Sequence, residues 1–352
     1  MTMIPIERVI IDAPFSSLLE TQNIEVPPTH SILVKVNMCG ICTSEQRVFK
    51  GTANKPYPYW GGHELFGCVE KIISKSKFNP GDYVALSLMP RCGICRYCLA
   101  GLDNHCAYVS RPNEFSQGPT GTRGFCNYIT VPDERAFLLP DIPDETYIFV
   151  EPTACVLRSI EVAGSIGRNV GIIGTGTFGI LHSIVLKQLG YNVILFGLER
   201  IYNQPICRMI DAYINIDDYA EGSMRPQIDA FFCTQYGEKG LVYALNMIER
   251  GGTIVLFQSI ANESVVSIDY NKVHYKEIKI HGSIAHTKRN FQDAVSFVSR
   301  HNDLYKILSL KIYSKKEHLA AFQESITHKF NRVAISLSLI HISEPTRRSY
   351  IS

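Results

Sequence analysis

Four cysteines in a short run constrain this chain more than any other feature. The run RCGICRYCLAGLDNHC contains Cys92, Cys95, Cys98 and Cys106, in the pattern C-x2-C-x2-C-x7-C. A ferredoxin run would have a shorter last gap and a proline after its fourth cysteine, whereas Ala107 follows here. Four thiolates suit the tetrahedral preference of zinc, and such a closed site leaves no position for a substrate. The spacing predicts a structural zinc ion that fastens residues 91–106, so any chemistry must lie elsewhere.

The overall composition is that of a globular protein without a strongly charged partner. The 352 residues, of which 45% are hydrophobic and 19% charged, correspond to about two domains. A formal net charge of +2 gives no reason to expect a nucleic acid or an anionic membrane as partner. No apolar run of about 18 residues and no secretory leader pattern is visible. We therefore expect a cytoplasmic protein, whose eleven cysteines serve metal binding or catalysis rather than disulfides.

The chain changes character near residue 162. Before it, short apolar runs such as SILVKVNMCGIC and YVALSLM, punctuated by Pro-Gly and Asp, predict a mostly antiparallel, barrel-like domain. After it, NVGIIGTGTFGILHSIVLKQLGYNVILF predicts a strand, a glycine turn, a helix and a second strand, which open a parallel α/β sheet. From about residue 287 the pattern is helical and polar, and it ends on the strand RVAISL. Residues 337–352 resemble translated sequencing-adapter read-through and are assigned no function, a frayed natural tail being the alternative.

A second metal site, able to do chemistry, is suggested upstream of the cysteine run. A catalytic zinc ion needs a few protein ligands and one open position for water or substrate. Cys42 in NMCGICTSE can supply a thiolate, and His63 in WGGHELFG a neutral imidazole. Each residue alone is a weak indication, because most single cysteines and histidines are packed or lie on the surface.

Four motifs together resemble one family. GICTSE, GGHE, the four-cysteine run and GTGTFG, in this order and at these separations, resemble the zinc-dependent medium-chain alcohol and polyol dehydrogenases. The resemblance implies a GroES-like catalytic barrel over residues 1–155 and a Rossmann domain, a doubly wound parallel sheet that binds NAD(P), over residues 156–286. Residues 287–336 would then return to the catalytic domain, and the active site would lie in the cleft between the two domains.

The resemblance also implies a set of ligands. Cys42 and His63 would bind the catalytic zinc ion, and Glu64 would reach it directly or through water. Glu151, in VEPTACVLRSIE, becomes the candidate third ligand, although a carboxylate that only stabilises a helix start is the alternative. Together with the four cysteines, this implies two zinc ions per chain. Glutamate rather than cysteine at position 151 favours the polyol, sugar or amino-alcohol branch, and Cys155 is expected in the core.

Proton transfer is expected to involve Ser44. In the family that this sequence resembles, a hydroxyl at this place begins the relay that takes the substrate proton, whereas an exposed serine without a role is the alternative. Many members have histidine three residues further on, where this chain has Arg47. Because arginine stays protonated, it cannot act as a general base. Either the proton leaves through the cofactor ribose and water, or Arg47 contacts substrate or phosphate.

The glycine turn predicts the dinucleotide site, because it follows a strand and opens a helix whose N-terminus can hold a pyrophosphate. The glycines of its G-x-G-x-x-G are Gly174, Gly176 and Gly179. The following segment, VILFGLER, does not decide between NAD and NADP. Glu199 could accept from a ribose 2′-hydroxyl, which favours NAD, or Arg200 could pair with a 2′-phosphate, which favours NADP. By the resemblance, Arg332 matches a basic position that contacts the cofactor pyrophosphate in some members, an exposed strand-end arginine being the alternative.

These residues predict a zinc-dependent, NAD(P)-linked oxidoreductase that transfers hydride between a secondary alcohol of a polyol, sugar or related compound and the nicotinamide. A threonine-type amino-alcohol dehydrogenase is one alternative, and a non-catalytic zinc- and nucleotide-binding protein is the other. The expected partners are a small-molecule alcohol or ketone and further copies of the chain, since members commonly form dimers or tetramers. A nucleic acid is disfavoured, because only Arg91 and Arg96 are basic near the cysteine run.

Overall fold

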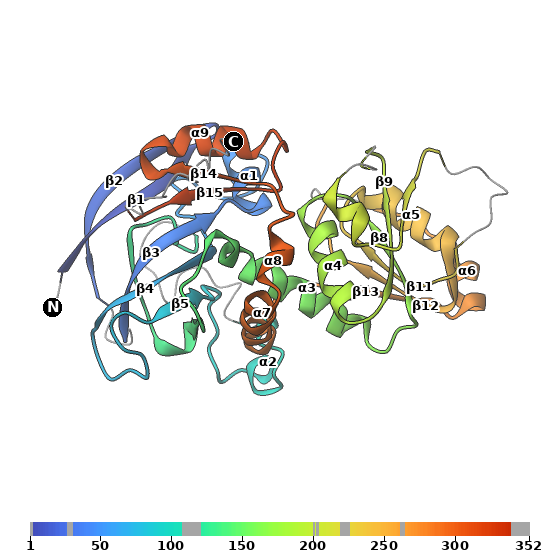
Figure 1. Ribbon diagram of the computed structural model, residues 1–352, viewed down its shortest axis with the longest axis horizontal. Helices are drawn as coiled ribbons and strands as arrows, with labels where there is room; N and C mark the ends of the chain where they lie inside the picture. Colours follow the sequence, from blue (N-terminus) through green and yellow to red (C-terminus); the bar gives the residue numbers. More distant parts are fainter. Residues whose placement is uncertain are drawn as a thin grey trace, which may run out of the picture.

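The computed structural model describes residues 3–26, 31–107, 121–199, 201, 204–218, 226–260 and 265–338. It has two bodies, each built on its own sheet, with helices between them (Figure 1). The first body contains both the N-terminal and the C-terminal described segments, and the second contains the middle of the chain.

The first body is built from antiparallel strands, apart from one parallel pair. Its strands are β1 (Met3–Ala13), β2 (Ser16–Glu25), β3 (Ile32–Gly40), β4 (Glu64–Ile72), β5 (Tyr83–Leu86), β6 (Tyr128–Val131), β7 (Ala136–Leu138), β14 (Leu310–Ser314) and β15 (Arg332–Ser336). Seven of them form one sheet in the order β14-β15-β3-β4-β5-β7, with β6 also paired to β3, while β1 and β2 form a hairpin. Only β14 and β15 run parallel. Strand β3 is mostly buried, because it pairs with β4, β6 and β15 at the centre of this body.

The last described segment returns to the first body. Strand β15 pairs with β3, and the Leu337 N–H donates to the Asn37 carbonyl at 3.0 Å. Leu337 is buried in the core of the barrel, so the packed chain continues one residue past the expected end at 336. The rest of the tail to which no function was assigned, residues 339–352, lies outside the described residues.

The second body is a wholly parallel sheet of six strands. They are β8 (Asn169–Ile173), β9 (Asn192–Gly197), β10 (Ala212–Asn215), β11 (Ile228–Cys233), β12 (Ile248–Leu256) and β13 (Lys279–Gly282). Their order, β10-β9-β8-β11-β12-β13, reverses its direction between β8 and β11, as in a Rossmann fold. Strands β8 and β11 are continuous apolar runs because helices cover both faces of the sheet. The predicted fold class, a GroES-like barrel with a Rossmann doubly wound sheet, is confirmed.

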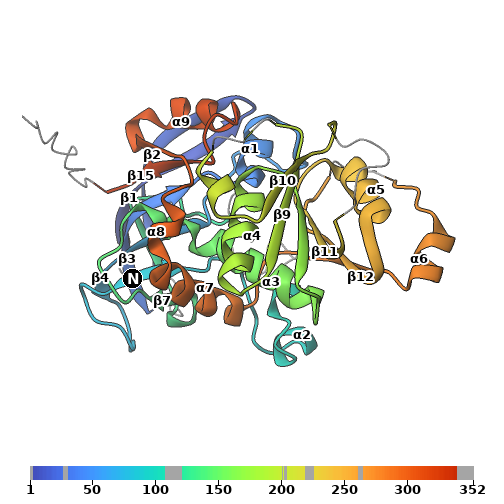
Figure 2. The same ribbon diagram turned by 45° about the vertical axis from the view of Figure 1, so that its right-hand side comes forward.

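Helices cover the two faces of the parallel sheet (Figure 2). Helix α4 (Thr177–Gln188) packs with Ile172 and Phe232 on one face, and α5 (Gly237–Met247) packs with Ile173 and Phe231 on the other. The remaining helices are α1 (Thr43–Phe49), α2 (Arg96–Leu99), α3 (Val150–Ala163), α6 (Tyr270–Lys276), α7 (Lys288–Arg300), α8 (Asn302–Tyr305) and α9 (His318–Ser325). Within the described ranges, no helix has the length and apolar character needed to cross a membrane.

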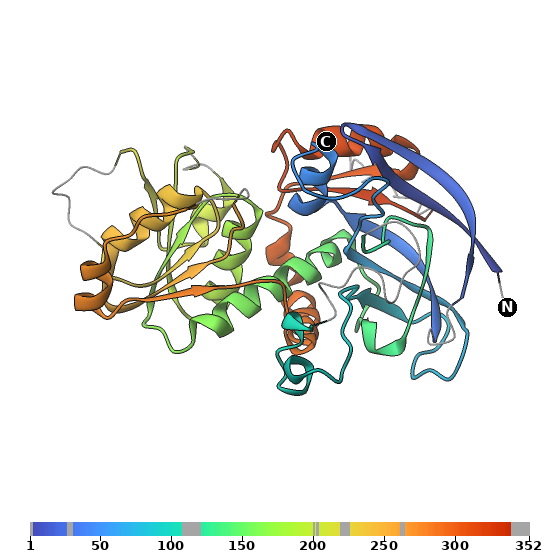
Figure 3. The ribbon, with the colours of Figure 1, turned by 180° about the vertical axis from the view of Figure 1, so that it is seen from behind.

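Helices α3 and α7 join the two bodies (Figure 3). One hydrophobic core runs from Phe66 and Phe137 of the barrel, through Phe291 of α7, to Ile172 of the parallel sheet. The rings of Phe137 and Phe291 are 4.7 Å apart between centroids. The expected domain boundary between residues 155 and 156 falls inside α3, because the apolar period of that helix continues across it.

Candidate active site

Three side chains that the sequence predicts as metal ligands lie together in the barrel. One ligand atom each of Cys42, His63 and Glu64 lies within 4.8 Å of the others. Cys42 directly precedes α1, and Glu64 begins β4. Because the register pairs Gly40 of β3 with Glu64 of β4, the antiparallel ladder brings the CGIC and GGHE motifs side by side.

The buried carboxylate of Glu64 is paired with Arg332 but is not fully satisfied by the surrounding chain. A Cβ atom at Gly40 would lie 2.5 Å from Glu64 Oε2, so this glycine leaves the room that the carboxylate occupies. Arg332 Nε lies 3.1 Å from Glu64 Oε2, but neither oxygen accepts a well-formed hydrogen bond from the described residues. Burial raises the pKa of Glu64 to about 7, although Arg332 opposes the rise. A thiolate, an imidazole and such a carboxylate fit a tetrahedral zinc ion with one open position.

The imidazole of His63 is held by a second buried carboxylate, Glu45. Glu45 Oε1 lies 3.0 Å from His63 Nδ1 and accepts from the Gly62 N–H at 3.1 Å. Glu45 Oε2 accepts from Ser44 Oγ at 2.8 Å. Burial would raise the pKa of Glu45, but His63 and these hydrogen bonds lower it overall. With Nδ1 turned toward Glu45, the other ring nitrogen remains for a metal, an arrangement common among zinc-binding histidines.

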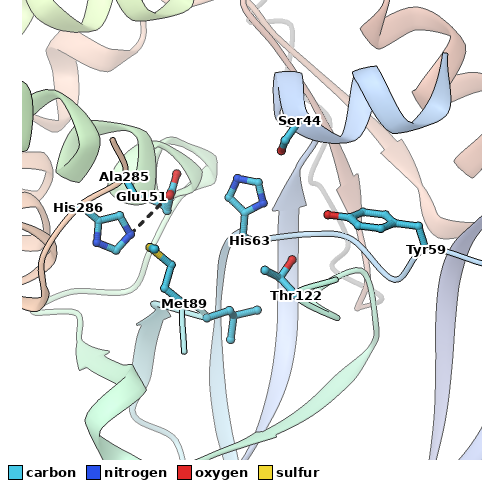
Figure 4. Close-up of a pocket in the computed structure, with 9 residues that line it drawn as sticks. Ser44, Tyr59, His63, Met89, Thr122, Glu151, Ala285 and His286 are labelled. Carbon is cyan, nitrogen blue, oxygen red and sulfur yellow. Dashed lines mark ion pairs between the residues drawn. The ribbon is translucent and has the colours of Figure 1, made fainter. Parts of the chain in front are cut away.

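Glu151 enters the pocket from the opposite wall, at the start of α3 (Figure 4). Its oxygens are not part of the cluster formed by Cys42, His63 and Glu64. Oε1 of Glu151 lies 3.5 Å from His286 Nε2. Burial would raise the pKa of Glu151, but the contact with His286 and the charge of His63 lower it to about 2. A direct bond from Glu151 to the same zinc ion therefore stays a prediction.

His286 is buried and lines the pocket, yet the sequence did not single it out. Arg91 Nη2, 195 positions earlier in the chain, donates to the His286 carbonyl at 3.0 Å. His286 Nδ1 lies 3.2 Å from both Arg91 Nη2 and the Thr287 carbonyl. Asp103 pairs with Arg91 Nε at 3.0 Å and accepts from the Lys288 N–H at 3.0 Å. Partners this distant in sequence leave no local motif by which His286 could have been found.

Arg91 and Asp103 belong to the predicted structural-zinc lobe, residues 91–106. The Sγ atoms of its cysteines, Cys92, Cys95, Cys98 and Cys106, lie within 4.8 Å of one another, and all four thiols are free of disulfides. Backbone N–H groups lower the pKa of Cys95 to about 6, which favours the thiolate. The geometry fits a tetrathiolate zinc site, and the same lobe fixes the pocket wall that carries His286.

The pocket between the two bodies has a volume of about 250 Å³. Its lining is Ser44, Tyr59, His63, Leu88, Met89, Thr122, Glu151, Ala285 and His286. Most of these side chains are polar, and they come from the barrel, from α3 and from the segment before α7 (Figure 4). Among the described residues, neither lysine nor arginine lines it.

The predicted dinucleotide residues lie at the carboxyl edge of the parallel sheet. The turn between β8 and α4 contains Gly174, Gly176 and Gly179. A Cβ atom at Gly179 would lie 1.9 Å from the Gly174 carbonyl oxygen, so only glycine lets this helix approach the strand. Glu199, two residues after β9, accepts from the Thr175 hydroxyl and therefore lies beside the same turn. Arg200 lies outside the described residues.

Two arginines from the barrel reach toward the cofactor sheet. Arg332 is buried at the start of β15, where it pairs with Glu64, and its guanidinium lies 6.0 Å from the Phe178 ring centroid in α4. Its predicted contact with the pyrophosphate stays a prediction. Arg47 in α1 donates to the hydroxyl and the carbonyl of Ser259, both at 2.7 Å. Because Ser259 follows β12, Arg47 bridges the two bodies.

Comparisons with known proteins agree with this architecture. The alcohol dehydrogenase GroES-like domain family matches residues 28–141. D-arabinitol dehydrogenase 1 of Uromyces fabae is 23% identical over 317 residues, which cover 86% of this chain and 89% of the relative. Galactitol 1-phosphate 5-dehydrogenase of Escherichia coli K12 is 35% identical over 161 residues, or 45% of each chain. L-threonine 3-dehydrogenase of Anaeromyxobacter is 23% identical, covering 72% of this chain and 75% of the relative.

Solved structures share the whole fold. L-idonate 5-dehydrogenase of Escherichia coli superposes with a TM-score of 0.82 at 20% identity and covers 95% of this chain and 99% of its own. By its sequence and its fold the chain is similar to the zinc-type medium-chain dehydrogenases. A zinc-binding dehydrogenase of Sinorhizobium meliloti, solved with NADP, has the same TM-score of 0.82 at 22% identity, covering 96% of this dehydrogenase and 100% of that chain. The predicted class, an oxidoreductase of the alcohol and polyol dehydrogenase family, is confirmed.

Proposed function

We propose that this dehydrogenase interconverts a secondary alcohol of a neutral polyol or sugar and its ketone, with zinc and NAD. The observation that carries the proposal is the cluster of Cys42, His63 and Glu64 beside the pocket between the two bodies. A closed tetrathiolate site alone could not bind a substrate, whereas this cluster leaves an open position. It therefore favours an enzyme over a non-catalytic zinc- and nucleotide-binding protein.

The two clusters support two zinc ions per chain. Cys42, His63 and Glu64 would hold the catalytic ion, with Glu151 facing it from α3, and the four cysteines of residues 91–106 would hold the structural ion. The catalytic ion, when bound, would supply a Lewis acid that polarises the substrate oxygen and lowers the pKa of its hydroxyl, while NAD accepts the hydride.

The chain itself orients the substrate hydroxyl. Ser44 lines the pocket, and because its own proton points at Glu45, its lone pairs can accept from the substrate. Glu45 stays ionised, since its pKa is lowered, so it keeps both Ser44 and His63 in place. Arg47 cannot accept the proton, and its contact with Ser259 favours a role at the boundary of the two bodies. The proton would then leave through the cofactor ribose and water.

The lining of the pocket favours a neutral polyhydroxy substrate. The pocket offers hydroxyl, imidazole and carboxylate groups that can bind substrate hydroxyls, beside an apolar part that includes Leu88, Met89 and Ala285. Neither lysine nor arginine is present among its described residues to pair with a carboxylate or a phosphate. This argues for a polyol or sugar over threonine. Two of the relatives are named as arabinitol and galactitol 1-phosphate dehydrogenases, and the first of these is named for a neutral polyol.

The position of Glu199 supports NAD as the cofactor. Its carboxylate accepts from the Thr175 hydroxyl at the glycine turn and from the Tyr236 hydroxyl, and its pKa is lowered despite partial burial. An ionised carboxylate there can accept from a ribose diol and repels a 2′-phosphate.

A dimer or tetramer is supported by the free edge of the parallel sheet. Strand β13 has no partner on its outer side among the described residues. Large apolar side chains near this edge are exposed: Val265, Ile268, Tyr270, Tyr275 and Ile284. Such a set commonly marks a protein interface. Light scattering behind a sizing column tests this directly, and a monomer at micromolar concentration would contradict it.

The catalytic assignment is tested by Cys42→Ser. We expect turnover of polyols with NAD to be lost while circular dichroism and the zinc of the 91–106 lobe are unchanged. Cys68→Ser is the matched control, because Cys68 is half-buried on β4 and outside both clusters. Full activity of the Cys42→Ser variant would end the proposal.

A further inference from the structure

The groove where an open α/β sheet binds its ligand lies at the carboxyl ends of the strands, where the strand order reverses. In this sheet that place lies between β8 and β11. The glycine turn follows β8, Glu199 follows β9, and Gln235 and Tyr236 follow β11. A dinucleotide bound here must contact all three loops.

The side chain of Gln235 accepts hydrogen bonds from two backbone N–H groups of the glycine turn. Its Oε1 accepts from the Thr175 N–H at 2.9 Å and from the Gly176 N–H at 3.3 Å. Cβ atoms placed on Gly174 and Gly176 would lie 2.8 Å from Gln235 Oε1 and Nε2 respectively. The space that these glycines leave open is therefore filled by a side chain, and an oxygen lies where a phosphate oxygen would be expected.

The hydroxyl of Tyr236 binds the carboxylate of Glu199, which lies beside the glycine turn. This hydroxyl donates to Glu199 Oε2 at 2.9 Å and accepts from the Leu198 N–H at 3.2 Å. The ring thereby spans from the end of β11 to the loop after β9. The backbone of Tyr236 has a φ of +66°, a left-handed conformation that is unusual for an aromatic residue. An outlier at a ligand edge points to a function for that position.

We propose that Gln235 and Tyr236 are further cofactor-site residues, which imitate the pyrophosphate and the ribose in the free protein and must move away when the dinucleotide enters. The inference rests on the proposed use of NAD. Each N–H of the turn has a single hydrogen to donate, so the cofactor and Gln235 compete for the same donors. The two residues would then set both the affinity for NAD and the rate of its entry.

The competition between Gln235 and the cofactor determines how much the affinity for the cofactor is reduced. A charged phosphate oxygen is a stronger acceptor than an amide oxygen, so the cofactor can displace Gln235. The hydrogen bonds that Gln235 gives up still offset part of the binding, by about 3- to 10-fold in affinity. The same displacement adds a step before binding, so the observed association rate should level off at high cofactor concentration.

Calorimetry and stopped-flow fluorescence with NADH test the proposal without turnover. We expect Gln235→Ala to bind NADH about 3- to 10-fold more tightly than the wild type and to lose the plateau in association rate. Gln235→Asn keeps the amide but is one methylene shorter, so it should behave like the alanine variant. Tyr236→Phe should also bind NADH more tightly. Its matched control is Tyr213→Phe, because the Tyr213 hydroxyl donates to the Glu199 backbone carbonyl.

The outcomes separate this inference from the proposed function. If the wild type binds NADH and the Gln235→Ala variant binds it equally well or more weakly, only this inference is overturned. Gln235 would then be either without effect on binding or a direct ligand of the cofactor. If neither protein binds NADH or NADPH, the proposed function falls as well. Circular dichroism of each variant establishes that the comparison is made between folded proteins.

Discussion

Removal of the Glu45 carboxylate should damage both the stability and the metal site. Glu45 is buried and accepts from three donors: His63 Nδ1, the Gly62 N–H and Ser44 Oγ. In Glu45→Ala, the buried Gly62 N–H and the half-buried His63 Nδ1 lose their acceptor, and each such group costs about 1–3 kcal/mol. The expected loss in the free energy of unfolding is therefore about 2–6 kcal/mol, a large part of the roughly 5–15 kcal/mol of a typical domain.

Glu45→Gln is the matched variant, because its amide oxygen can still accept from His63 and Gly62. We expect it to lose less than about 1 kcal/mol of stability. Both variants should bind zinc at the Cys42 cluster about 10- to 100-fold more weakly, since the carboxylate orients the imidazole of His63. Urea unfolding monitored by circular dichroism gives the first quantity, and competition with a chelator gives the second. A Glu45→Ala variant as stable as the wild type would show that these hydrogen bonds do not stabilise the fold.

Three other predictions follow from side chains around the pocket and in the parallel sheet. His286→Phe should lower kcat about 10-fold or more by releasing Glu151, with the zinc of the 91–106 lobe retained; an unchanged kcat would show that the 3.5 Å contact has no role. Cys98→Ser should disorder that lobe and, through Arg91, raise hydrogen exchange in residues 284–288; unchanged exchange there would contradict the coupling. Burial lowers the pKa of His182 to about 4, so the unfolded chain takes up its proton first as the pH falls. Stability should drop between about pH 6.5 and 4 by at most about 3 kcal/mol, and less in His182→Gln, as acid-dependent urea unfolding can measure.

The features that were predictable from sequence are local. The four-cysteine spacing and the glycine turn each lie within a short segment, so their chemistry can be recognised without a fold. Cys42 and His63 needed the strand register of β3 and β4 to become neighbours, and the resemblance to the dehydrogenase family supplied that register. Glu45 carries a usable signal, because it is an acidic residue only three positions after the predicted ligand Cys42.

The features that were not predictable depend on residues far apart in the chain. His286 reaches the pocket only because Arg91 and Asp103 hold its segment. Arg332 pairs with Glu64, 268 positions earlier, inside the barrel. The contacts of Gln235 with the glycine turn span 60 positions and depend on the order of the parallel strands. No periodicity or motif encodes such contacts, so they require the tertiary structure.

We propose that one chain holds a closed structural zinc ion and an open catalytic one. The most direct measurement is the metal content of the wild type, Cys42→Ser and Cys98→Ser by elemental analysis, with cobalt spectra of each. We predict two metals per wild-type chain and one in each variant, with a tetrathiolate spectrum surviving only in Cys42→Ser. A wild type with a single metal and a purely tetrathiolate spectrum, in protein purified with zinc present throughout, would contradict a catalytic zinc ion at the Cys42 cluster.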